Sequence, residues 1–246
     1  MKKNKFVTMS LFAAVALFAG SAFADGAKES TFAELKALKD GKGDRTGVTE
    51  SFRIGVIPEQ DKMNGVSLAL VSNIDNEMHG FEFAFILNAA DKSSSGFQWG
   101  LLWGNYVNDG DFGGVQWGLV QNRVGGDMTG WQSAAGMNLV KGDMCGLQGA
   151  WIYNSVEEGD MTGVQFAWVN DVDNNATGVQ FGLINMVDEK MNGVQFGFAN
   201  LAETANGIQC GFYNQANDLC GIQLGLVNRL KSSEKYPFTV FLRAVF

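Results

Sequence analysis

Few residues in this chain have the type and spacing that catalysis requires. His79 is the single histidine, and it precedes Gly80 in a context typical of a turn. A nucleophilic mechanism needs a base within hydrogen-bond reach, and one histidine cannot be paired with a serine or a cysteine before the fold is known. We therefore interpret His79 as an exposed loop residue, predict no catalytic residues and expect that the protein is not an enzyme.

A metal site is suggested at one place only. Asp171, Asp173 and Asn175 have the spacing with which a calcium-binding loop begins. The position at which such a loop needs a chelating glutamate is Gly182. We interpret the stretch as an ordinary acidic turn and expect neither a metal nor a cofactor.

The three cysteines, Cys145, Cys210 and Cys220, form neither an even set nor a C-x-x-C motif. A bridge between Cys210 and Cys220 remains open if the protein reaches an oxidising compartment. Three small buried thiols are the alternative that we expect.

The first 24 residues have the features of a cleavable secretory signal. Three lysines precede a mainly apolar run over residues 6–18, and Ala22 and Ala24 provide the small residues that a cleavage site near Ala24 needs. Within residues 25–48, Thr31 and Glu34 form a capping box for a short helix over residues 30–39, which a linker follows. We expect an exported protein whose repeat domain covers residues 49–246.

The charge balance disfavours one class of partner. The formal net charge is −8, and removal of the three signal lysines would leave 15 basic against 26 acidic residues, a net charge of −11. Binding to nucleic acid depends on basic patches that neutralise phosphates. We therefore expect no nucleic-acid partner.

From residue 49 onward the chain consists of tandem repeats of 14–18 residues. Three of them are nearly identical: MTGVQFAWVN, ATGVQFGLIN and MNGVQFGFAN, over residues 161–200. Read with the period of two of a β-strand, glycine and glutamine point to one side, and Val, Phe and Trp point to the other. Charge is concentrated between the units, where turns are expected.

Two all-β architectures account for this pattern. An antiparallel membrane-type β-barrel of about 12–14 short strands needs about 9–11 residues per strand, with bulky apolar side chains towards lipid and small or polar ones inside. A parallel β-solenoid would stack Asn, Gln and Gly in columns around a Val/Phe/Leu core. Variation in repeat length, six tryptophans and an apolar C-terminus favour the barrel. We expect a structural or passively permeable, porin-like barrel, with a secreted or surface-attached solenoid scaffold that binds a protein or glycan as the alternative.

In the barrel, the polar residues that recur once per repeat would face the lumen. They would line it with neutral amides and one acid, or simply fill the interior. These residues are Glu82, Gln98, Gln116, Gln165, Gln180, Gln195, Gln209 and Gln223.

The repeated unit reads G-[VI]-Q-[FWLC]-[GA]-x-x-N over residues 62–230 and is best kept over 163–228. It resembles the bacterial surface-repeat proteins, which are built on tandem G-V/L-Q-x-G-L-x-N units. That resemblance implies a cell-envelope location and carries no catalytic residues. Separately, residues 238–246 are similar to the C-terminal signal of outer-membrane barrel proteins, apart from the nearby Pro237. This second resemblance implies an outer-membrane or cell-surface location, with membrane lipid and the barrel-assembly machinery as partners.

Overall fold

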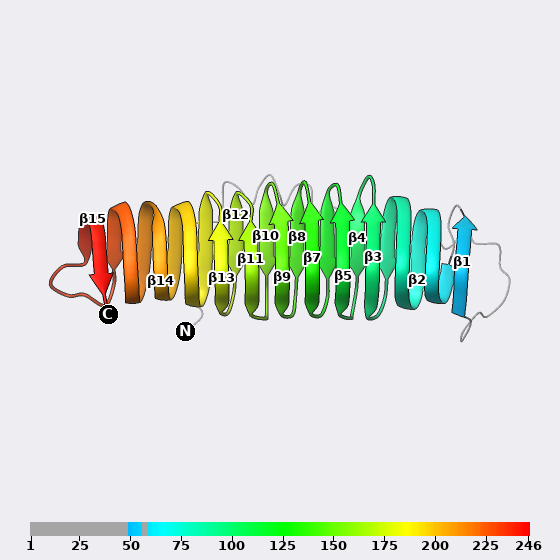
Figure 1. The fold of residues 1–246 in the computed structure, drawn as a ribbon, viewed down its shortest axis with the longest axis horizontal. Helices are drawn as coiled ribbons and strands as arrows, with labels where there is room; N and C mark the ends of the chain where they lie inside the picture. Colours follow the sequence, from blue (N-terminus) through cyan, green and yellow to red (C-terminus); the bar gives the residue numbers. More distant parts are fainter. Residues whose placement is uncertain (1–48, 56–58) are drawn as a thin grey trace, which may run out of the picture. The chain divides into compact units, whose positions relative to one another are not determined.

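Residues 49–55 and 59–246, which the computed structural model describes, form a parallel β-solenoid (Figure 1). The expected antiparallel barrel of 12–14 strands, and with it a porin-like architecture, is therefore wrong. The signal sequence and the helix over 30–39 lie outside the described residues. Arg45–Phe246 forms one compact unit by itself.

Each turn of the solenoid contributes a long strand to one face and a short strand to the other. The long strands stack in the order β1-β2-β3-β5-β7-β9-β11-β13-β14, and the short strands stack in the order β14-β12-β10-β8-β6-β4. The two stacks join because β2 and β14 continue through several turns. The strands are β1 (Thr49–Gly55), β2 (Glu59–Ala90), β3 (Ser94–Gly100), β4 (Gly104–Val107), β5 (Phe112–Gly118), β6 (Gln121–Val124), β7 (Met128–Ala134), β8 (Met137–Val140), β9 (Met144–Ala150), β10 (Tyr153–Val156), β11 (Met161–Phe166), β12 (Val169–Val172), β13 (Ala176–Phe181), β14 (Ile184–Leu230) and β15 (Phe238–Val245).

Successive repeats pair in identical register. Gly163 lies opposite Gly178, and Gln165 lies opposite Gln180, in the pairing of β11 with β13. On the other face, Asn170 lies opposite Asn185 where β12 pairs with β14. A parallel pair can repeat this match indefinitely, so a tandem repeat becomes a set of columns parallel to the solenoid axis. Between β3 and β13 the repeat length varies from 15 to 18 residues, and this variation does not disturb the columns.

The glycine that opens each repeat is required by its backbone. Gly163 has a φ of 133°, in a region that L-amino acids rarely adopt. A Cβ at Gly163 would lie 2.0 Å from the carbonyl oxygen of Gly146 in the preceding turn. The positive φ and the close carbonyl oxygen recur at the opening glycines of the other repeats, which stack in a column. Each turn therefore approaches its neighbour backbone to backbone at this glycine.

The interior is divided into an apolar half and an amide half. Met161 and Val172, with their equivalents in the other turns, are buried beside the turns that connect one repeat to the next. The recurring glutamine and asparagine are buried in the other half. The Val/Phe/Leu set, which the solenoid alternative had placed in the core, is on the outside, because its positions alternate with those of the buried Met161 and Gln165 and their equivalents.

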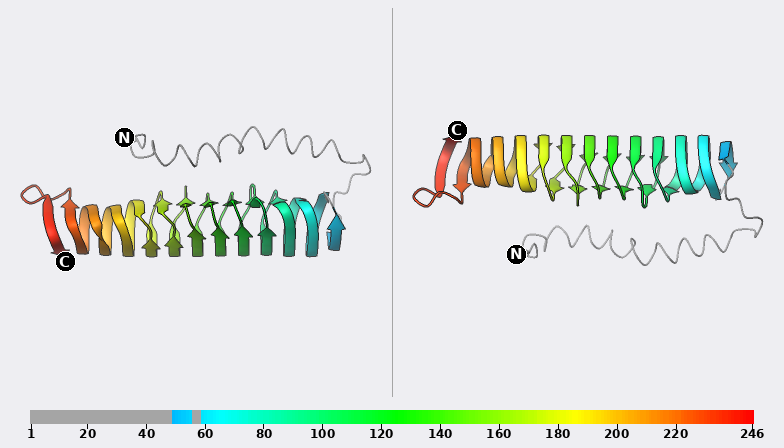
Figure 2. Two further views of the ribbon diagram at one scale, coloured as in Figure 1. Left: turned by 90° about the horizontal axis from the view of Figure 1, so that it is seen from above. Right: turned by 90° about the horizontal axis from the view of Figure 1, so that it is seen from below.

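The C-terminal end is closed by β15, which pairs antiparallel with the last turn of β14 (Figure 2). Arg243 of β15 lies opposite Gln223, is buried, and donates hydrogen bonds to Thr239 Oγ1 at 3.2 Å and to the Tyr236 carbonyl. The final strand is therefore a cap for the solenoid. The expectation of a membrane-spanning strand at this end is wrong.

Candidate functional site

The glutamines form one continuous column of side-chain hydrogen bonds. Gln165 Nε2 donates to Gln148 Oε1 at 2.7 Å, and Gln180 Nε2 donates to Gln165 Oε1 at 2.8 Å. The column begins at Glu82, whose Oε2 accepts from Gln98 Nε2 at 2.8 Å. The structure thus places the polar residues expected in a barrel lumen inside the solenoid: Glu82, Gln98, Gln116, Gln165, Gln180, Gln195, Gln209 and Gln223, joined by Gln132 and Gln148.

The asparagines form a second column with the opposite polarity. Asn170 Nδ2 donates to Asn185 Oδ1 in the following turn at 2.9 Å, whereas each glutamine donates to the preceding turn. Asn170 Nδ2 also donates to the Phe181 carbonyl at 2.8 Å. Because the amide dipoles of the two columns point in opposite directions along the axis, they offset each other, and a long stack can grow without accumulating a net dipole.

The columns leave polar atoms without partners only where they end. Among the described residues, the buried side-chain atoms that lack a hydrogen-bond partner are Glu82 Oε1, Asn88 Oδ1, Gln223 Oε1 and Arg243 Nη1. At the N-terminal end, burial raises the pKa of Glu82 to about 7, although hydrogen bonds with Ser72 and Gln98 oppose this shift. Glu82 is therefore the titratable group through which pH acts on the column.

Glu82→Gln would make the column uniform, because every other member is already a glutamine. The unfolded carboxyl ionises near its ordinary pKa of 4.5 and the folded one near 7. Below pH 4.5 both states are protonated, so Glu82 lowers stability only as pH rises from about 4.5 to 7, by about 3 kcal/mol in total. The variant is expected to match the parent at pH 4.5 and to exceed it by up to that amount at pH 8 in urea unfolding. A parent–variant difference that is the same at both pH values would contradict this assignment.

The most extensive surface feature is an apolar face formed by the outward side chains at the ends of the long strands and at the corners that follow them. Trp151 and Trp168 are the most prominent, with 72% and 56% of their surface exposed. We name the following exposed set the apolar face: Phe85, Trp99, Leu102, Leu119, Trp151, Phe166, Trp168, Phe181, Leu183, Phe196, Phe198, Phe212, Leu224 and Leu226.

Neighbouring members of the apolar face contact each other along the axis. The rings of Phe181 and Phe196 are parallel with centroids 5.2 Å apart, and those of Phe198 and Phe212 are 4.8 Å apart. With about 4.8 Å between turns and about 7 Å between alternate residues, the 14 members cover roughly 470 Å² along the solenoid. The largest apolar patch on a typical monomeric protein is about 300–600 Å². This face is therefore as large as the largest apolar patch of a typical monomer, which is often functional.

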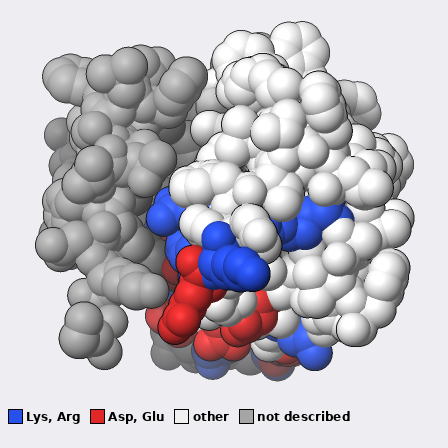
Figure 3. Space-filling model, turned by 90° about the vertical axis from the view of Figure 1, so that its left-hand side faces the viewer, with Lys and Arg blue, Asp and Glu red and all other residues white. Residues whose placement is uncertain are grey.

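Charge lies on the opposite edge of the solenoid. The turns that connect one repeat to the next carry Asp127 and Asp143, and the carboxylate of each accepts a hydrogen bond from a backbone amide of a neighbouring turn. In the end view of Figure 3, the charged side chains gather in the lower part of the visible surface and the upper part carries none. The cross-section is therefore amphipathic, with acidic turns on one edge and apolar corners on the other.

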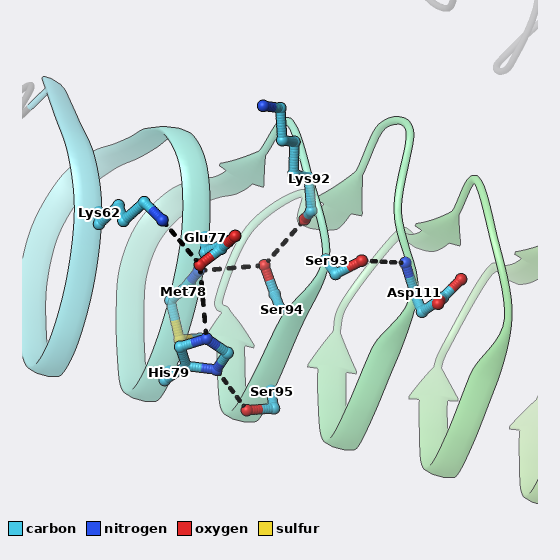
Figure 4. A network of polar contacts seen from close by, with 9 residues as sticks. All are labelled: Lys62, Glu77, Met78, His79, Lys92, Ser93, Ser94, Ser95 and Asp111. Atoms are coloured by element: carbon cyan, nitrogen blue, oxygen red, sulfur yellow. Dashed lines mark hydrogen bonds and ion pairs between the residues drawn. The ribbon is translucent and has the colours of Figure 1, made fainter. Parts of the chain in front are cut away.

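One polar cluster does bring together residues that could do chemistry (Figure 4). His79 Nδ1 lies 2.7 Å from Ser95 Oγ, and His79 Nε2 lies 4.0 Å from Glu77 Oε2. The second distance is too long for a hydrogen bond, and Glu77 is paired with Lys62 Nζ at 3.1 Å. The carboxylate thus does not hold the imidazole as a catalytic triad requires, and we rank this cluster below the apolar face.

The proximity of His79 and Ser95 escaped the sequence analysis, although a signal was present. Both residues directly precede a repeat glycine, so parallel stacking makes them neighbours. His79 is exposed, as expected, but it lies in β2 and not in a loop.

The other candidate positions form no site. Asp171 accepts a hydrogen bond from Tyr153 Oη at 3.1 Å, and the described residues contain no group of three or more His, Cys, Asp or Glu that could hold a metal. The three cysteines are unpaired, and Cys145 and Cys220 are exposed, so the prediction of three buried thiols is wrong. In the part of the chain that is described, no helix is long and apolar enough to cross a membrane.

Comparison with known proteins adds no relative. No family model, curated protein or solved structure matches this chain. The established points are tandem repeats, Asn and Gln columns and a β-solenoid. The functional assignment must therefore come from the surface that the solenoid presents.

Proposed function

We propose that this protein is an exported, non-enzymatic β-solenoid scaffold that attaches to the outer membrane or cell surface through its apolar face. The supporting observation is the asymmetry of the cross-section, which keeps Trp151 and Trp168 in solvent while amides and smaller apolar side chains fill the interior. Large exposed apolar patches mark protein or membrane interaction sites. The signal-like features of residues 1–24 support export.

The energetic scale of such attachment follows from the exposed area. Full burial of a large apolar side chain contributes about 1.5–3 kcal/mol. Three half-exposed corner residues would then contribute about 3 kcal/mol or more to association, a change of roughly 100-fold in an equilibrium constant. Removing a few neighbours from one edge should therefore release the protein.

The test compares two triple variants in fractionated cells. The corner variant carries Trp151→Ser, Trp168→Ser and Leu183→Ser. The end variant carries Tyr236→Ser, Phe238→Ser and Phe246→Ser, which also removes exposed apolar surface but at the C-terminal cap. We expect the parent and the end variant to sediment with the envelope and the corner variant to be mainly soluble.

Circular dichroism provides the control, because both variants should retain the β-spectrum of the parent. A corner variant that is folded and still sediments like the parent would refute attachment through the apolar face.

A further inference from the structure

We infer that the apolar face binds the acyl-chain region of a lipid bilayer, with the solenoid axis parallel to the membrane plane. This inference rests on the proposed attachment and specifies the partner. Three observations favour lipid: the backbone at the corners, the variability of the exposed columns and the location of the polar groups.

Contact with hydrocarbon requires that backbone polar groups are hydrogen-bonded, and the amides at three corners of the apolar face meet this requirement. The amide of Trp168 donates to the Trp151 carbonyl at 3.0 Å, and the amide of Leu183 donates to the Trp168 carbonyl at 2.9 Å. The amide of Leu102 likewise donates to the Phe85 carbonyl at 3.0 Å. At these three corners the amides are paired with the neighbouring turn, so they can enter an apolar phase without exposing unpaired N–H groups to it.

The apolar face has no constant shape from repeat to repeat. The interior columns keep glutamine and asparagine through successive turns, whereas the corner position is Phe, Leu or Trp in most turns and Ala135 beside Leu119. At the preceding outward position, Phe166 has Gly149 as its neighbour. A protein partner would need a complementary contour at each step, while fluid acyl chains adapt to an uneven one. What recurs in most turns is therefore apolar character, and not a fixed contour that a protein partner could match.

The polar groups lie where a peripheral membrane protein needs them, away from the apolar face. A glycan-binding face would need exposed polar groups beside its aromatic side chains. Sugar recognition combines aromatic stacking with hydrogen bonds, but the glutamine and asparagine amides are buried and already bonded to each other. The acidic turns lie on the other edge, where they would stay in water. Tryptophan side chains such as Trp151 and Trp168 are favoured at membrane interfaces. Binding should thus require neither anionic lipid nor low salt.

The test uses vesicles of phosphatidylcholine alone and the chain as it is isolated from cells, with residues 1–48 unchanged in every variant. We expect the parent and the end variant to cosediment with the vesicles, and the corner variant to bind at least 20-fold more weakly. Binding should be retained in 1 M salt, because the face carries no charge.

A conservative variant separates insertion from simple adsorption. Trp151→Phe with Trp168→Phe keeps the apolar surface, so it should bind like the parent. Its tryptophan emission should be quenched less by brominated acyl chains, because Trp99 is then the one tryptophan left in the apolar face.

The outcomes distinguish the two proposals. If the parent fails to bind vesicles while the corner variant is still released from the envelope, attachment stands and the partner is a protein or a second copy of the chain, which ultracentrifugation would show. Equal vesicle binding by the parent and the corner variant would also refute the lipid assignment. If the corner variant is not released from the envelope, the proposed function itself fails.

Discussion

Replacement of Gly114 by alanine is expected to lower the free energy of unfolding by at least about 3 kcal/mol, since it combines backbone strain with a backbone clash. Gly114 has a φ of 135°, and a Cβ there would lie 2.0 Å from the Gly96 carbonyl oxygen. Neither atom belongs to a side chain that could rotate away, so the two turns would have to separate. Urea unfolding followed by circular dichroism measures the loss.

The adjacent Gly113 is a matched control. A Cβ at Gly113 would meet only the Ser95 Cβ, at 3.9 Å, and the residue has no positive φ. Gly113→Ala should therefore be neutral or stabilise by up to about 1 kcal/mol through reduced freedom of the unfolded chain. If both substitutions have the same effect, the glycine column is not the point of closest approach that the structure describes.

Gln165→Leu should have the second large effect, because it interrupts the amide column at its middle. The substitution keeps a similar volume but leaves Gln148 Oε1 without its donor and Gln180 Nε2 without its acceptor. Each orphaned buried group costs about 1–3 kcal/mol, so we expect a loss of about 4 kcal/mol in the free energy of unfolding. The same urea experiment measures it.

Gln223→Leu provides the comparison at the end of the same column. Gln223 Nε2 donates to Gln209 Oε1 at 2.8 Å, but its own Oε1 already lacks a partner. The substitution orphans one group and removes another, so its effect should be less than half that of Gln165→Leu. Equal losses at the two positions would mean that packing, and not hydrogen bonding, dominates the column.

Both predictions follow from an interior that differs from that of most domains. Stacked backbones, amide columns and medium-sized side chains such as Met161 and Val172 hold the turns together. The largest side chains, including Trp151 and Trp168, are not needed for this interior and remain exposed. The fold can therefore retain its stability while its outer columns vary, which is why the corner variant is expected to fold.

The repeat predicted much of the local structure. The alternation in residues 161–166 places Gln165 on the side opposite Val164 and Phe166, and the structure has the same division. The repeat did not reveal which strands pair with each other, because an alternating strand has the same pattern in a barrel and in a solenoid. The repeat has the strand length and the two-sided pattern of an antiparallel barrel, but it pairs in parallel. Similarly, the apolar end at residues 238–246 resembled a membrane strand and is a cap.

The sequence by itself determined that the chain is a tandem β-repeat with charged connections and two chemically distinct strand faces, because these properties depend only on residue order and the period of two. Tertiary structure alone decided that identical residues stack in parallel register. Amide columns form only when Gln165 lies beside Gln148 and Gln180, and the glycine column forms only when turns approach within backbone contact. Those interactions join residues about one repeat apart, so no local pattern could display them.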